Sequence, residues 1–205
     1  MYTLYSRPGS GGFVAEAALA ITGAPFRLVN VARDAPGPDF LAISPLRQVP
    51  ALVLPDGRAM TESAAISIHL ADLFPASALA PRGDAPERAD FLRWMLFMSS
   101  ALYPALLRYF YAERYTADPA GSKPVMEAAL SEADRGFLVV ERALSGRDWL
   151  VGDGMTIADI YLLMLAHWHP VADRPREEWV NIVSLCARLA QHPVVAELNR
   201  SHRFW

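Results

Sequence analysis

Two short segments of this sequence combine residue types that could bind a peptide-like molecule. The first is residues 44–52, with the sequence SPLRQVPAL, in which Pro50 stands directly before a predicted strand. A proline there would disturb pairing inside a sheet because it lacks an N–H group. A cis Val49–Pro50 bond at a tight bend would leave the main-chain N–H and C=O of Val49 free to pair with an extended ligand. The alternative is an ordinary trans proline at the start of an edge strand, which the base rate favours.

The second segment begins a predicted helix with Thr61, Glu62 and Ser63. It brings together a carboxylate, a hydroxyl and the unpaired N–H groups of a helix start. Such a set could hold an amino-acid head group, with Glu62 on the ammonium and Ser63 and the helix N-terminus on the carboxylate. The alternative is capping, in which Thr61 or Ser63 is the N-cap and the helix dipole favours Glu62.

The elements that must position these residues begin with a small α/β unit over residues 1–75. Strands are predicted over 2–6, 26–31 and 51–54, with a very short fourth strand after a turn at 55–57, and helices over 13–21 and 62–74. Gly23 should end the first of these helices. The first two strands are joined through a helix, so they should be parallel.

The rest of the chain shows no convincing strand. Residues 76–86 are predicted to be a linker, because Pro75, Pro81 and Pro86 leave no room for regular structure. Helices are predicted over 88–115, 123–144, 156–168 and 178–191, with a further short one from Pro193, and Pro104 should kink the first of them. The fold class is therefore α/β plus all-α, with an α/β domain over 1–75 and an all-helical domain over 87–205.

Composition excludes several classes of protein. The 205 residues are 53% hydrophobic and carry a formal charge of −3, which excludes a disordered chain and gives no basic field for nucleic acid. No apolar run reaches the roughly 18 residues of a membrane span, and the first residues lack a signal-peptide pattern. A single cysteine, Cys186, excludes an internal disulfide, a zinc site of paired thiols and a CxxC redox centre. We expect a soluble, cytoplasmic protein.

Taken together, the PGS turn at 8–10, the PLRQVPAL segment, the MTESAAISIHLAD segment and the all-helical second half resemble a cytosolic glutathione S-transferase of bacterial type. The resemblance covers essentially the whole chain. It implies a thioredoxin-like first domain with a cis-proline at Pro50, a helical second domain and a homodimer. It also implies that glutathione is the co-substrate, that no other cofactor and no metal is needed, and that the partner substrate is a small hydrophobic electrophile.

The resemblance further implies roles for individual residues in glutathione binding. Val49 would pair its main chain with the cysteinyl unit, and Gln48 lies beside it. Glu62 and Ser63 would take the γ-glutamyl end. Arg33 stands where a basic residue often meets the glycyl carboxylate, with a solvated loop arginine as the alternative.

Glutathione attacks electrophiles as a thiolate, whereas a free thiol, with a pKa of about 8.5, is mostly protonated at neutral pH. Ser10 follows the turn and opens a helix, so a hydroxyl donor and the positive end of a dipole could together lower that pKa. A plain N-cap serine is the alternative. Tyr5 is the competitor, because tyrosine-type members of the family carry their phenol at a comparable place, and Ser6 is a weaker third candidate. The turn contains no cysteine, which argues against the branches that attack with their own sulfur.

The second substrate would lie on the helical half. Tyr103, Leu107, Tyr111 and Trp168 could form an apolar wall with hydroxyls that orient a polarised substrate, although such a stripe is more often part of a core than of a pocket. Two other functions stay open. One is a non-catalytic glutathione-binding or scaffold protein of the same fold, and the other is a glutathione-dependent dehalogenase or isomerase.

Three further features are predicted to be structural. Thr156 and Asp159 have the spacing of a capping box. The five histidines show no metal-ligand spacing and are interpreted mostly as surface or helix-end residues. Cys186 lies on an apolar helix face as a small buried hydrophobe.

Overall fold

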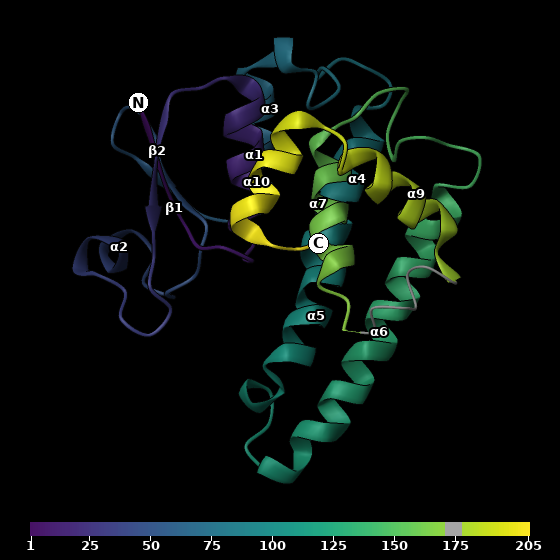
Figure 1. The fold of residues 1–205 in the computed structure, drawn as a ribbon. Helices are drawn as coiled ribbons and strands as arrows, with labels where there is room; N and C mark the ends of the chain where they lie inside the picture. Colours follow the sequence, from purple (N-terminus) through teal and green to yellow (C-terminus); the bar gives the residue numbers. More distant parts are fainter. Residues whose placement is uncertain (171–177) are drawn as a thin grey trace.

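The first half of the molecule is a four-stranded sheet with helices beside it (Figure 1). The computed structural model describes residues 1–170 and 178–205. The elements of this half are β1 (Tyr2–Ser6), α1 (Gly12–Thr22), β2 (Phe26–Asn30), α2 (Pro38–Ile43), β3 (Ala51–Val53), β4 (Ala59–Met60) and α3 (Ser63–Leu73). The strand order is β2-β1-β3-β4; β1 and β2 are parallel, whereas β3 is antiparallel to both β1 and β4. The predicted parallel pair and short fourth strand are confirmed.

The helix α1 is apolar on nearly all sides because it is packed on several of them. Its residues from Gly12 to Leu19 are buried. It contacts β1, α3, α7 (Ile157–His167) and α10 (Pro193–His202). Gly23 ends it in the left-handed conformation, at φ 68°, and its N–H donates to the carbonyl of Ala20. A glycine is favoured there because a Cβ would be strained.

In the described residues of the second half, every regular element is a helix. Besides α7 and α10, its main helices are α4 (Arg88–Phe97), α5 (Tyr103–Phe110), α6 (Ser122–Ala143) and α9 (Val180–Leu189). The helix predicted over 88–115 is present from Arg88 to Phe110, with a π-helical turn, η2 (Met98–Leu102), between α4 and α5. The prediction is wrong only at its end, where the helix is followed by a 3₁₀ turn, η3 (Ala112–Arg114). Pro104 is the second residue of α5, one residue after this π-helical turn. A proline cannot supply the N–H that a regular helix needs, so the irregular turn lies where the sequence predicted a disturbance of the helix.

The connection between the halves is more ordered than its prolines indicate. Pro75–Ser77 forms the 3₁₀ helix η1, because proline suits the first turn of a helix, so the expectation of no regular structure is wrong there. Leu79 is fully buried, and its carbonyl accepts a hydrogen bond of 2.8 Å from the N–H of Ile157. Arg88 forms two hydrogen bonds of 2.8 Å to the carboxylate of Asp72, which joins α4 to α3. One hydrophobic core runs through both halves, so the halves are packed directly on each other.

The features predicted to be structural are so in this fold. Thr156 and Asp159 form the capping box of α7: the N–H and hydroxyl of Thr156 donate to the Asp159 carboxylate at 2.7 and 3.0 Å. The half-buried Cys186 packs against the core, and burial raises the pKa of its thiol to about 12, so it is not a reactive thiolate. Among the described residues, no helix has the length and apolar character that crossing a membrane requires.

Candidate active site

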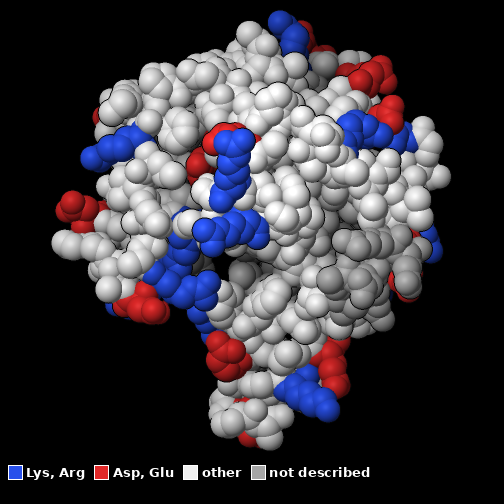
Figure 2. Space-filling view, in the orientation of Figure 1, with Lys and Arg blue, Asp and Glu red and all other residues white. Residues whose placement is uncertain are grey.

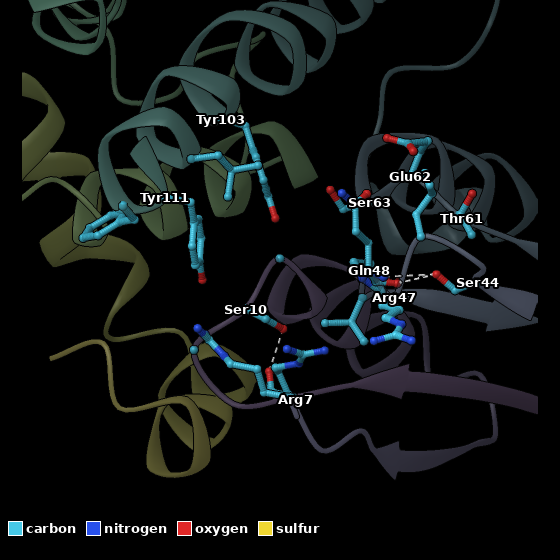
Figure 3. Close-up of a pocket in the computed structure, with 18 of the residues that line it drawn as sticks. Arg7, Ser10, Ser44, Arg47, Gln48, Thr61, Glu62, Ser63, Tyr103 and Tyr111 are labelled. Carbon is cyan, nitrogen blue, oxygen red and sulfur yellow. Dashed lines mark hydrogen bonds between the residues drawn. The ribbon is translucent and has the colours of Figure 1, made fainter. Parts of the chain in front are cut away.

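A cleft of about 980 Å³ lies between the two halves. The sheet side supplies the loops after β1, β2 and α2 and the start of α3, and the helical side supplies α5, η3 and α7 (Figure 3). Every residue that the sequence proposed for the site lines this cleft except Tyr5 and Ser6; those lining it are Ser10, Arg33, Gln48, Val49, Pro50, Glu62, Ser63, Tyr103, Leu107, Tyr111 and Trp168. The structure thus brings together residues from both halves of the chain.

The ridge before β3 presents a free backbone edge to the cleft. The Val49–Pro50 bond is cis, as expected. Across residues 1–170 and 178–205, neither the N–H nor the C=O of Val49 has a hydrogen-bond partner. The buried Ser44 holds Gln48, the residue before Val49, in place. The Ser44 hydroxyl donates to the carbonyl of Gln48 at 2.8 Å and accepts from the N–H of Gln48 at 3.2 Å (Figure 3). Sequence reasoning did not identify Ser44 as the residue that holds this ridge.

The start of α3 offers polar groups that its own helix does not use. Glu62 precedes the helix with φ 66° and ψ 107° and forms no side-chain cap. The first described N–H of this turn with a backbone acceptor is that of Ile66, which donates to the Glu62 carbonyl, so the preceding N–H groups remain available. The capping interpretation is wrong for Thr61 and Ser63. The reason is that the Ser63 hydroxyl is turned to Tyr161.

Tyr161, on α7, is the residue of the helical half that contacts the start of α3 in this part of the cleft. Its hydroxyl lies 2.9 Å from the Ser63 hydroxyl, and both residues are buried. Burial raises the pKa of Tyr161, so the phenol stays protonated and can donate to Ser63. That donation would leave the Ser63 hydroxyl hydrogen free for a ligand. Tyr161 stands in an apolar run that reads as core, and nothing in its local sequence signals a place in a cleft.

Ser10 lies in the tight turn that leads into α1. Its hydroxyl donates to the Arg7 carbonyl at 2.6 Å and accepts from the Gly12 N–H at 3.2 Å (Figure 3). The oxygen is therefore held over the first turn of α1, where the helix dipole is positive. The neighbouring Gly11 has no room for a Cβ, because the Tyr103 hydroxyl lies against it. Ser10 thus sits at the meeting point of the turn, the helix start and the helical half.

The two competitors of Ser10 point elsewhere. The Tyr5 ring packs on Phe40, with 5.8 Å between centroids, in a small apolar cluster that includes Val31 and Ala51. Ser6 is 2% exposed, and its hydroxyl lies beneath Gly12 without a hydrogen-bond partner among the described residues. Neither residue lines the cleft. The structure therefore argues against both as groups that touch a bound thiol.

A buried polar chain fixes the same turn from the far end of the sequence. The Gly9 N–H donates to Nδ1 of His202 at 3.2 Å, and Nε2 of His202 lies 3.0 Å from the Glu16 carboxylate. With Nδ1 accepting, the ring proton lies on Nε2 and is donated to Glu16. Both side chains are nearly fully buried. His202 stands at a helix end, as predicted for these histidines, but it is buried rather than exposed; the same holds for His169, which follows the end of α7 and lies 2.9 Å from Asp134.

The helical wall of the cleft is aromatic and polar at once. Tyr103 has the edge of Trp168 against its ring, with 5.1 Å between centroids. Burial, with smaller effects from Tyr111 and Glu62, raises the pKa of Tyr103 to about 12, so its hydroxyl is neutral at physiological pH. Figure 3 shows the hydroxyls of Tyr103 and Tyr111 pointing from this wall toward Ser10 and Arg7. Leu107 adds an apolar surface between them.

No group of three or more histidine, cysteine or acidic side chains in the described ranges could hold a metal ion. The polar groups of the cleft are instead hydroxyls, guanidinium groups, free backbone N–H groups and the carboxylates of Asp34 and Glu62. Such a set suits a zwitterionic, peptide-like ligand with carboxylate ends.

Comparison with known proteins matches both halves of the chain. Residues 15–73 match the N-terminal domain of glutathione S-transferases, and residues 94–193 match the C-terminal domain. Glutathione S-transferase GST-4.5 of Xanthomonas campestris is 34% identical over 166 residues, which is 80% of this chain and 81% of that protein. Glutathione S-transferase GstA of Escherichia coli O157:H7 is 29% identical over 198 residues, 95% of each. Among solved structures, a sphingomonad glutathione S-transferase complexed with glutathione superposes with a TM-score of 0.86 at 30% identity over 98% of each chain.

Proposed function

Since this chain belongs to the glutathione S-transferase family and is a glutathione transferase, we propose that its interdomain cleft binds glutathione and that Ser10 activates the thiol. The observation that carries this proposal is the position of Ser10 in the cleft, at a helix start. A free backbone edge at Val49 and free N–H groups at α3 line the same cleft. These are the three contacts that a γ-linked tripeptide with a central thiol needs.

Each part of glutathione has a partner in this arrangement. The cysteinyl unit pairs its main chain with Val49, next to Gln48 and on the ridge formed by Pro50. The γ-glutamyl ammonium meets Glu62, and its carboxylate meets Ser63 and the N–H groups of α3, where a helix start favours an anion. The glycyl carboxylate meets Arg33, which lines the cleft from the loop after β2.

Ser10 needs little rearrangement to act on the sulfur. Its oxygen is held by the Gly12 N–H, so only the hydroxyl hydrogen has to turn from the Arg7 carbonyl to a thiolate. The neutral bond that is lost contributes about 1 kcal/mol, whereas a bond to an anion contributes about 1.5–3 kcal/mol. The difference corresponds to a glutathione pKa lowered by about one unit. The helix dipole acts in the same direction.

The thiolate then attacks an electrophilic carbon held on the helical wall, without a covalent enzyme intermediate. Tyr103 contributes a neutral hydroxyl, because its pKa of about 12 keeps it protonated. Leu107, Tyr111 and Trp168 hold the apolar part of the electrophile.

We propose further that the chain divides at a linker over 76–86, between domains over 1–75 and 87–205, and that it acts as a cytoplasmic homodimer.

The proposal is tested by comparing Ser10→Ala with Tyr5→Phe in an assay that conjugates glutathione to an aryl halide. Ser10→Ala should lower kcat at least about tenfold, as expected for the loss of a hydrogen bond to an anion. Calorimetry should show little change in the Kd for glutathione. Tyr5→Phe should keep near-normal activity, because the phenol packs on Phe40 outside the cleft. Full activity in Ser10→Ala, or a large loss only in Tyr5→Phe, would refute the role of Ser10.

A further inference from the structure

Arginines gather on the cleft although the whole chain is acidic. Arg7, Arg33, Arg47 and Arg114 line it, against two carboxylates, Asp34 and Glu62. The formal charge of the chain is −3. Figure 2 shows several basic side chains, drawn in blue, beside the hollow between the sheet side and the helical side. The cleft is therefore a local positive region on a negative protein.

These arginines lack the carboxylate partners that surface arginines of the chain have. Arg58, Arg82 and Arg188 each form an ion pair at 2.7 to 3.2 Å. In the described part of the chain, Arg7, Arg33 and Arg47 form none within 4.0 Å, and Arg114 only touches its exposed neighbour Glu113 at that limit.

Arg7 is the most constrained of the four. Its Nε atom is buried and has no hydrogen-bond partner among the described residues. Burial, and then the charge of Arg33, lower the pKa of Arg7. A buried donor without an acceptor, beside a like charge, is unfavourable. An anion in the cleft would satisfy both the donor and the charge.

Three of these guanidinium groups converge on the aromatic wall. The Arg114 guanidinium lies 4.0 Å from the centre of the Tyr111 ring, and the Arg33 guanidinium lies 5.8 Å from it. Arg7 lines the same part of the cleft, near Tyr103 and Tyr111. This is the wall that faces the second substrate, so the positive charge reaches past the glutathione half of the cleft.

Glutathione alone does not use this charge. Its ammonium is matched by Glu62, its γ-glutamyl carboxylate by the start of α3, and its glycyl carboxylate by one arginine. Arg7, Arg47 and Arg114 remain, and of these Arg7 and Arg114 lie next to Tyr111. Resting on the proposed function, we propose that the second substrate of this cleft is an electrophile that carries a carboxylate, which Arg7 and Arg114 bind while its apolar ring lies on Tyr111.

The carboxylate serves as a handle and does not react. With a chloroaryl carboxylate, the thiol proton of glutathione first goes to solvent. The thiolate sulfur then forms a bond to the ring carbon that carries chlorine, the C–Cl bond breaks, and chloride leaves with its electron pair. The product is the thioether, with the carboxylate intact.

The test uses two probes that differ in charge, a chloronitrobenzoate and the matching chloronitrobenzamide, each referred to its uncatalysed rate with glutathione. The wild-type protein should give a kcat/KM about tenfold or more higher for the benzoate, mainly through a lower KM, since an ion pair with arginine contributes about 1.5–3 kcal/mol. The preference should shrink as salt is added.

Variants locate the effect. Arg114→Gln should reduce the benzoate preference several-fold, and Arg7→Gln should do the same. Arg114→Gln should also leave the kcat/KM for the benzamide within about a factor of two. Arg58→Gln, which removes an exposed arginine outside the cleft, is the matched control and should leave the preference unchanged.

Two outcomes separate this inference from the proposed function. Conjugation of both probes at equal efficiency, or a preference that survives in Arg7→Gln and Arg114→Gln, overturns the inference and leaves the transferase intact. Failure to accelerate either probe over the uncatalysed reaction overturns it as well, and places the fault in the proposed use of the cleft.

Discussion

Replacement of Tyr161 by phenylalanine should weaken glutathione binding indirectly, because Ser63 loses the hydrogen bond that orients its hydroxyl. The Tyr161 hydroxyl lies 2.9 Å from the Ser63 hydroxyl, and the two residues are 1% and 9% exposed. If Tyr161 donates to Ser63, then the Ser63 hydrogen is directed to the γ-glutamyl carboxylate. Losing one neutral hydrogen bond of this kind weakens the binding free energy by about 1 kcal/mol, which raises the Kd for glutathione about fivefold.

The comparison that makes this prediction sharp is a double-mutant cycle. Ser63→Ala removes the donor to the carboxylate and should raise the Kd for glutathione about thirtyfold, since a bond to a charged group contributes about 2 kcal/mol. In the Ser63→Ala background, Tyr161→Phe should add nothing further, because its only route to the ligand has gone. Calorimetric titration of the four proteins measures this directly, and urea unfolding checks that each is folded.

Additive losses would refute the reasoning. If Tyr161→Phe raises the Kd as much without Ser63 as with it, then Tyr161 contacts glutathione by itself, and the assigned direction of the Ser63–Tyr161 bond is wrong. An unchanged Kd in Tyr161→Phe with intact Ser63 would contradict the supporting role altogether.

Three further predictions concern the same cleft. Glu62→Gln should raise the glutathione Kd about tenfold, because the ammonium loses its charged partner, while Glu87→Gln at the exposed start of α4 should leave calorimetric titrations unchanged. Tyr103→Phe should lower kcat by a factor that stays constant up to about pH 10, since a hydroxyl whose pKa is raised to about 12 remains protonated below that pH; a factor that varies over this range would show that the phenol ionises during turnover. His202→Phe should lower kcat more than it changes the Kd for glutathione, because the turn before Ser10 loses the acceptor of the Gly9 N–H. Glu16→Gln in the same background should restore part of the lost stability by removing a buried, unpaired carboxylate, and equal losses of kcat and affinity would argue against a positioning role.

Features set by local sequence were predictable. Gly23 ends α1 because only the residue after the helix has to adopt a positive φ, and the glycine marks it. Thr156 and Asp159 form their capping box within one turn. The short fourth strand follows a Pro-Asp-Gly turn that forces the chain back on itself. In each case the residues that interact are neighbours in the chain.

Features that depend on distant partners were not predictable. The Ser63–Tyr161 pair joins residues separated by 98 positions, and the Glu16–His202 pair joins residues separated by 186. Glu16 and Tyr161 each stand in an apolar helix, where a single polar group gives no sign of its partner. The interpretation of Ser63 as a helix cap failed for this reason, because a cap is a local solution and the distant tyrosine was not considered.

The sequence alone could not decide whether the hydroxyl of Ser10 or that of Tyr5 faces the thiol. Both stand near the end of β1, and either hydroxyl could serve a thiol. Alternation along the strand turns Tyr5 toward Phe40, and that placement depends on where the loop before β3 packs. Only the folded chain distinguishes a residue that lines the cleft from one that lies behind it.

The measurement that tests the account most directly is a crystal structure of this protein with glutathione bound. The account predicts the cysteinyl main chain paired with Val49, the γ-glutamyl carboxylate at the first turn of α3, and the sulfur within hydrogen-bond distance of the Ser10 hydroxyl. A tripeptide that lies elsewhere in the cleft, or a sulfur that contacts a different hydroxyl, would contradict it.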